Sequence, residues 1–262
     1  MRLPVLAAAL GLSLAGCLTV GDEGTPAPAG GDPGPGPGPG MGSDPAPVPD
    51  PVTPKLDVTV DKPTISTELY STNMVTVSLH ASGGLTGPVA LTASAVDGAG
   101  AALPAWTVTL DASTVELAAD GTATAVATLK VPSDSAAMQG TVKVEATSAA
   151  ATLTTSTSSM VTVAKQLTVP LTLDAAGDCV YPKEMVGTVK VQNGTLIRWV
   201  NNAASPVTIH ITTPKIDGLT HQQGATAAGG KYEQTVAGTS GTTDWYCHNL
   251  NDPKNMLLQA VP

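Results

Sequence analysis

The chain has 262 residues and a formal net charge of −9, and 13% of its residues are charged. Aromatic residues make up 3% of the sequence, without any Phe, so the core must be built mainly from Val, Leu, Ile and Ala. An acidic chain without a basic stripe to neutralise phosphates argues against nucleic acid as a partner. The length allows one or two domains, and the abundance of Thr and Val favours strands.

The N-terminus has the pattern of a targeting segment. Arg2 precedes an apolar run over residues 3–14, which is too short to span a membrane as a stable helix. Leu-Ala-Gly-Cys follows at 14–17 and resembles the lipobox of bacterial lipoproteins. The resemblance implies that residues 1–17 are a lipoprotein signal peptide and that Cys17 is acylated and becomes the mature N-terminus. The alternative is an ordinary signal peptide that contains a Cys.

Acylation determines the expected location of the protein. Lipid chains anchor a protein by burying CH₂ groups at about 0.8 kcal/mol each, so the mature chain is expected to be tethered to a lipid membrane rather than to span it. Leu18 follows Cys17, where an Asp would resemble an inner-membrane retention signal. The sequence therefore predicts a cell-envelope lipoprotein and favours the outer membrane, while the choice between the two membranes stays open.

Residues 18–54 have the composition of a linker. They hold half of the chain's 22 prolines, with Pro and Gly alternating over 33–40. Such a stretch has little to bury and few backbone donors, so it is expected to be disordered and extended. We interpret it as a spacer, with a Pro-rich ligand for some partner as the alternative.

Residues 55–165 predict a β-sandwich. Apolar and polar residues alternate with period two in several short runs, as half-buried strands require. These runs cover 56–60, 74–79, 106–110, 122–131 and 141–146. Gly-Gly, Asp-Gly and Gln-Gly pairs separate them as turns. Short strands at this spacing suggest an immunoglobulin-like sandwich.

Three further segments of this region, 87–92, 114–117 and 121–124, look like those of bacterial Ig-like surface modules. The resemblance implies a spacer or adhesive role without chemistry. His80 is the single histidine of the region, and we interpret it as a residue on a strand face rather than as a ligand.

The last hundred residues also predict strands separated by tight turns. The expected strands cover 167–173, 187–191, 196–200, 207–212, 231–236, 245–247 and 257–261. Gln192-Asn193-Gly194 and the Asn pair at 201–202 supply two of the turns.

The order of these elements resembles the cupredoxins, the small Greek-key β-sandwiches that house blue copper. The resemblance rests on the Tyr-Pro step at 181–182, the turn at Gly194, a strand ending Trp-Val-Asn-Asn at 199–202, and the Tyr-Cys pair at 246–247 followed by Met256.

The resemblance covers residues 166–262 and implies copper binding and electron transfer. The expected fold class is therefore all-β, with an Ig-like sandwich followed by a cupredoxin-like one.

Blue copper needs two imidazoles, a thiolate and usually a weak axial Met. The resemblance places the thiolate at Cys247 and the axial Met at Met256. It places the first imidazole at Val207, and His210 lies at an odd offset from that position, on the opposite strand face. The second imidazole should lie a few residues after the Cys, where the sequence offers only the adjacent His248. Both expected imidazoles are thus missing.

One interpretation is a domain that keeps the fold without blue copper. If Cys17 is acylated, Cys179 and Cys247 remain as an even pair in an oxidising compartment. In the cupredoxin scheme the loop that carries Cys179 runs near the copper end of the sandwich. We therefore expect a Cys179–Cys247 disulfide in place of the metal, in a binding or structural module.

A second interpretation is a rearranged metal site. His210 and His248 share the opposite face and could approach each other if their strands are neighbours, and His221 in the 218–230 loop could join them. Such histidines could bind copper or zinc. The alternative is that each is an ordinary strand or loop residue.

Catalysis has no support in the sequence. G-x-S-x-G, H-E-x-x-H, Walker and dinucleotide-binding motifs are absent, and no spacing suggests a catalytic triad. We expect a protein that is not an enzyme and whose partner, beyond the membrane, is a redox or surface protein of unknown identity.

Overall fold

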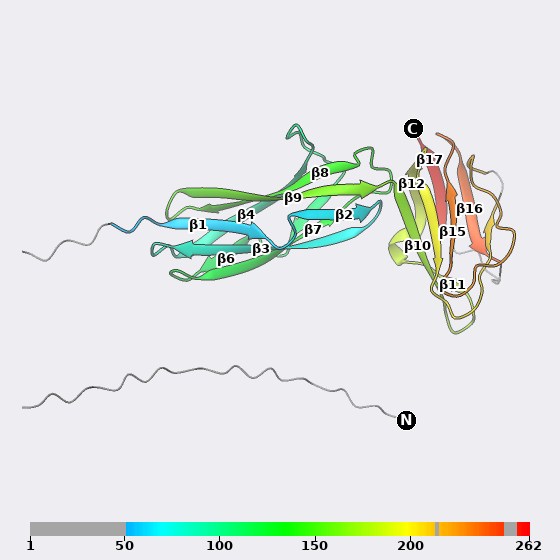
Figure 1. Ribbon diagram of the computed structural model, residues 1–262, viewed down its shortest axis with the longest axis horizontal. Coiled ribbons are helices and arrows are strands. Elements are labelled where there is room, and N and C mark those ends of the chain that lie inside the picture. The colour runs from blue at the N-terminus through cyan, green and yellow to red at the C-terminus, as the bar shows by residue number, and fades with distance from the viewer. Residues whose placement is uncertain (1–50, 213–214, 249–255) are drawn as a thin grey trace, which may run out of the picture. The chain divides into compact units, whose positions relative to one another are not determined.

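The structure is a computed structural model that describes residues 51–212, 215–248 and 256–262. Seventeen strands and one short 3₁₀ helix, η1 (Lys183–Met185), make up the regular elements of these residues (Figure 1). The predicted all-β fold class is confirmed. The described part of the chain contains no helix that is both long and apolar enough to cross a membrane. The predictions for Cys17 and for the linker up to residue 50 lie outside the described residues.

The first nine strands form two sheets. Their bounds are β1 (Lys55–Val60), β2 (Thr64–Glu68), β3 (Thr72–Ser82), β4 (Gly87–Val96), β5 (Thr107–Leu110), β6 (Thr114–Leu117), β7 (Thr122–Lys130), β8 (Gln139–Ser148) and β9 (Leu153–Ala164). The strand orders are β1-β3-β7-β5 and β2-β9-β8-β4-β6. Alternate residues of these strands are buried in one shared core, in which Trp106 is the only buried aromatic residue.

All five alternating runs predicted in this region fall on strands, although Trp106 lies just before β5. β2 and β9 escaped the sequence analysis. β9 begins Leu-Thr-Thr-Ser-Thr-Ser-Ser, so its apolar alternation starts only near Met160. Its first half is instead a strand through its pairing with β8, which extends over all of β8 and over residues 153–162 of β9.

The remaining strands form two further sheets. Their bounds are β10 (Gln166–Leu173), β11 (Cys179–Val180), β12 (Gly187–Gln192), β13 (Leu196–Asn201), β14 (Ile209–Ile211), β15 (Lys231–Thr235), β16 (Thr242–Cys247) and β17 (Met256–Val261). The strand orders are β11-β10-β13-β15 and β12-β17-β16-β14. β10 runs parallel to β13 and β12 runs parallel to β17. Strands that are distant in sequence therefore lie next to each other, and parallel neighbours of this kind need crossover connections.

The core of these two sheets is richer in aromatic residues. Trp199 and Trp245 are almost fully buried and meet edge to face, with 5.8 Å between their ring centroids. Tyr181 packs on Trp245 at 5.5 Å. Such pairs add about 0.5–1.5 kcal/mol beyond the area that they bury, which compensates for the scarcity of aromatic residues elsewhere.

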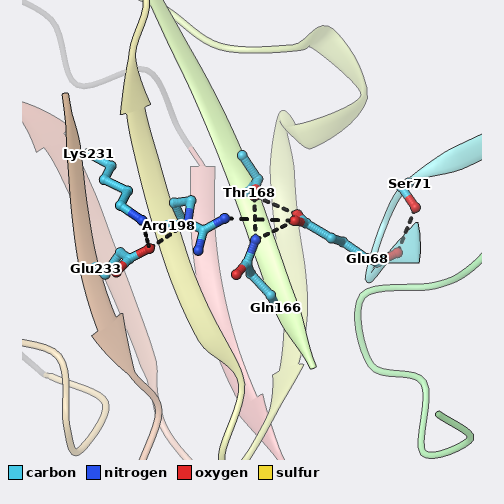
Figure 2. A network of polar contacts seen from close by, with 7 residues as sticks. All are labelled: Glu68, Ser71, Gln166, Thr168, Arg198, Lys231 and Glu233. Carbon is cyan, nitrogen blue, oxygen red and sulfur yellow. Dashed lines mark hydrogen bonds and ion pairs between the residues drawn. The ribbon is translucent and has the colours of Figure 1, made fainter. Parts of the chain in front are cut away.

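A polar network gathers around Glu68, the last residue of β2, and Arg198 on β13 (Figure 2). The Glu68 carboxylate accepts hydrogen bonds from Gln166 and Thr168 of β10. Arg198 lies 3.9 Å from the same carboxylate and also pairs with Glu233. The bond to Arg198 holds the pKa of Glu233 below its usual range.

Candidate metal centre

The Cys179–Cys247 disulfide is present. The S–S distance is 2.03 Å and the Cα atoms are 6.2 Å apart, within the range that a bridge requires. Both cysteines are buried. Because its sulfur is bonded to Cys179, Cys247 has no thiolate to offer a metal. The blue-copper ligand set is therefore not assembled, and the expected alternative, a disulfide in its place, is the arrangement found.

The resemblance to cupredoxins expects a metal-binding imidazole at position 207, where the structure places an apolar side chain in the core. Val207 is almost fully buried, and Met256 is fully buried at the start of β17. Neither residue reaches the surface on which the histidines lie. The structure does not bring the predicted candidates Cys247 and Met256 together with the histidines.

His210, His221 and His248 form a cluster whose candidate ligand nitrogens all lie within 4.8 Å of one another. His248 is exposed and the other two are half-buried. The Nδ1 atom of His210 is 3.0 Å from Nε2 of His248, and Nε2 of His221 is 2.8 Å from the same atom. The structure thus brings together the three histidines of the second interpretation.

Strand geometry places His210 in the cluster. It lies on β14 between Ile209 and Ile211, which are both buried, so its own side chain faces the opposite side. β14 pairs with β16 in antiparallel register, and His210 is directly opposite Tyr246. The two rings stack with 4.6 Å between their centroids.

His248 follows directly after β16. Its backbone N–H donates to the carbonyl oxygen of Thr208 at 3.0 Å, so the pairing with the β14 segment continues one residue past β16. The predicted strand at 207–212 is shorter than expected, because Val207 forms an isolated bridge with Thr226. The shared parity predicted for His210 and His248 nevertheless holds, since the two strands are neighbours.

His221 reaches the cluster from the segment between β14 and β15, through its neighbour Gln222. The backbone N–H of Gln222 donates to Ile209 O at 3.1 Å, and the Gln222 Oε1 atom accepts from Ile209 N at 2.7 Å. Gln222 therefore pairs with the free edge of β14 and is buried there. The sequence analysis did not identify Gln222, because Gln223 next to it has the same chemistry and only the fold decides which is buried.

Several other described residues of this segment make contacts that hold it in place. Ile216 and Leu219 are buried anchors. Thr220 N–H donates to Gln234 Oε1 at 2.7 Å, and Tyr232 Oη donates to the Thr220 carbonyl at 3.0 Å. The position of His221 is thus fixed by contacts with β14 on one side and β15 on the other.

The hydrogen bonds of His221 fix its tautomer. Nδ1 lies 2.5 Å from the carbonyl oxygen of Gln222, which can only accept, so Nδ1 carries the proton. In neutral His221 the lone pair is then on Nε2, the atom that faces His248. A backbone carbonyl in this role is the usual outer partner of a metal-binding histidine.

Hydrogen bonds within the cluster satisfy it only in part, because His248 Nε2 carries either one proton or one lone pair. The His221 Nε2 lone pair needs the His248 Nε2 proton, which leaves His248 Nε2 without a lone pair for His210. The contact between His210 Nδ1 and His248 Nε2 is then not a full hydrogen bond, because the His248 Nε2 proton is already used by His221. A cation between the three nitrogens would accept all three lone pairs.

Burial holds the pKa of His210 below its usual range, and the electrostatic interactions with His221, His248 and Lys215 lower it further. The neutral form is the one that binds metals. A tetrahedral zinc ion with Zn–N bonds of about 2.0–2.1 Å keeps its ligand nitrogens roughly 3.3 Å apart. The distances from His248 Nε2 to His210 Nδ1 and to His221 Nε2 are shorter than that. Small rotations of the exposed His248 would open them.

Comparisons with known proteins do not assign the chain to a family. No family model and no curated protein matches it. Among solved structures, a family 123 glycoside hydrolase from Clostridium perfringens is 8% identical with a TM-score of 0.35, covering 42% of this chain and 27% of its own.

Two more solved structures have similarly low scores. The periplasmic chaperone SfaE is 11% identical with a TM-score of 0.30, covering 78% of this chain and 99% of its own. A purple cupredoxin from Nitrosopumilus maritimus is 17% identical with a TM-score of 0.25, covering 36% of this chain and 97% of its own. All these TM-scores are below 0.5, so the likenesses carry no argument for this chain.

Proposed function

We propose that this protein is a cell-envelope lipoprotein whose C-terminal sandwich binds one transition-metal ion through His210, His221 and His248. The observation that carries the proposal is the convergence of three imidazole nitrogens, of which His248 Nε2 can make a full hydrogen bond with only one neighbour at a time. The three residues come from β14, from the segment before β15 and from the end of β16, so a bound ion would link three parts of the chain.

The ligand type favours copper and zinc. Imidazole suits both metals, and the general order of affinities places Cu²⁺ above Zn²⁺. With Cys247 in the disulfide, a copper ion here has imidazole ligands and no thiolate from this pair. We therefore expect a weakly coloured copper(II) site without the intense thiolate band of blue copper.

The N-terminal pattern supplies the setting for the module. The lipobox at 14–17 would anchor the mature chain, and the Pro-rich residues 18–54 would hold the sandwiches away from the membrane. The metal centre would then face the periplasm or the cell surface, where metals are exchanged with the surroundings.

A metal titration tests the proposal. The full chain, purified in detergent and stripped with a chelator, is titrated with Cu²⁺ and with Zn²⁺, and bound metal is measured by equilibrium dialysis. We expect one equivalent for the native chain, and at least a tenfold weaker affinity for His210→Ala, His221→Ala and His248→Ala.

His80→Ala is the matched control, since His80 is the chain's fourth histidine and lies on β3. It should bind metal as the native chain does. Equal affinity in all four variants, or no binding by the native chain, would contradict the proposal.

The disulfide favours one other function, a metal-free binding or structural module. A buried bridge adds about 2–4 kcal/mol to a small domain, which stabilises the fold without any ion. In that case the native chain and the three histidine variants should all leave the metal in solution.

A further inference from the structure

The ligands of the proposed metal centre do not neutralise the charge of the ion. The cluster contains three histidines, and no Asp, Glu or Cys among the described residues joins it. Three neutral imidazoles leave the full double charge of the metal ion in place. We propose that the bound metal keeps an exchangeable coordination position that takes a small anion; this inference rests on the metal-binding function proposed above.

The count of ligands gives the first support. Zinc takes at least four ligands, and sites with three protein ligands keep the fourth position for water or substrate. Copper(II) favours four or more ligands in a tetragonal arrangement. The described residues supply three, one fewer than either metal takes.

Exposure gives the second support. His248 is exposed, and the cluster lies on the outer face of β14 and β16 rather than in the core. The Tyr246 ring stacks on His210 and lies 6.1 Å from the His248 ring, so it flanks the cluster. A small ligand can therefore reach the metal from solvent.

The surrounding charge selects an anion. The Lys215 charge is among the causes that lower the pKa of His210. Lys215 is exposed, and no ion pair of Lys215 is found among the described residues. The double charge of the ion favours an anion, and the Lys215 ammonium group adds to that preference.

Azide is a suitable probe, because it is a small monoanion that gives a charge-transfer band when it binds copper(II). The copper-loaded full chain is titrated with sodium azide at constant ionic strength and followed by absorption. We expect a saturable new band with one azide per copper, no band with the metal-free chain, and a much weaker band with His248→Ala at the same copper concentration.

Lys215→Gln tests the charge argument. The variant should still bind one copper, whereas its azide affinity should be about two- to fivefold weaker, the size expected for an exposed charge. The difference should shrink as salt is raised. Lys190→Gln is the matched control, because Lys190 is exposed on β12, at the far edge of the same sheet.

The outcomes separate the two proposals. A chain that binds one copper but gives no azide band would overturn the exchangeable position and leave the metal site standing. A native chain that binds no metal would overturn both. An azide band of native strength in His248→Ala, at the same copper concentration, would mean that azide binds copper held elsewhere, which also contradicts the inference.

Discussion

A substitution of Gln222 tests whether the three histidines form a metal site or are merely neighbours. Its buried side chain accepts from Ile209 N, which places the preceding His221 beside β14. Residues that position metal ligands typically change the affinity by about 10–100-fold when they are replaced. We therefore expect Gln222→Ala to weaken copper binding by about that factor in the dialysis measurement.

Gln223 is the matched control for Gln222. It is exposed, and no side-chain hydrogen bond of Gln223 is found within the described ranges, so Gln223→Ala should bind copper as the native chain does. If both Gln variants kept native affinity while Gln222→Ala unfolded more easily, Gln222 would be structural only.

Gly218 gives a second prediction at this scale. Its φ is +86°, and an added Cβ would lie 2.1 Å from the carbonyl oxygen of Thr235. Gly229 also has a positive φ, +73°, but open space at the Cβ position. Gly218→Ala should lower the free energy of unfolding by about 1–3 kcal/mol more than Gly229→Ala does.

Urea denaturation of the two glycine variants measures this difference. The positive φ costs energy in both variants, so their difference isolates the clash with Thr235. Equal midpoints would show that the Gly218 segment adjusts freely, and would weaken the view that it holds His221 in place.

At the scale of elements, the disulfide joins the short strand β11 to the end of β16. The two cysteines are 68 positions apart in the sequence, so the bridge closes a long loop. Removal of both sulfurs in Cys179→Ser/Cys247→Ser should cost about 2–5 kcal/mol. The midpoint of guanidinium denaturation, measured with and without reductant, gives the value.

The native chain should lose a similar amount when reductant is added, whereas the double Ser variant should not change. A native chain that is indifferent to reductant after unfolding and refolding would mean that the bridge adds no stability. The variant also shows whether His248, which directly follows Cys247, depends on the bridge for its metal affinity.

Much of the strand pattern could be predicted from the sequence, because half-buried strands alternate visibly. The shared facing of His210 and His248 followed from strand parity, and the pairing of β14 with β16 then brought them together. β9 and β11 were not predicted, since Thr- and Ser-rich or very short strands are defined by their partners rather than by their own pattern.

The candidate site could be predicted only in part for a related reason. The membership of His221 depends on Gln222 pairing with the edge of β14, which is a contact between distant segments. The alternation of apolar and polar residues along a strand does not reveal such contacts. Lys215 and Tyr246 were missed too, because charge and stacking at a site become visible only once the strands are paired.

At the scale of the whole molecule, the lipobox-like pattern at 14–17 predicts that the proposed metal centre is held at a membrane. In cells that process lipoproteins, Cys17→Ser should abolish labelling by a radioactive fatty acid and shift the protein from the membrane to the soluble fraction. Copper binding by the purified variant should be unchanged, since Cys17 is not among the proposed metal ligands. A Cys17→Ser protein that remained lipid-labelled would contradict the anchoring.

The most direct test of the central claim is to locate the metal itself. Crystals of the copper-loaded chain, measured at the copper absorption edge, should give one anomalous peak about 2.0–2.1 Å from His210 Nδ1, His221 Nε2 and His248 Nε2. A peak elsewhere, or copper bound to other residues while these three nitrogens stay in contact only with one another, would contradict the account.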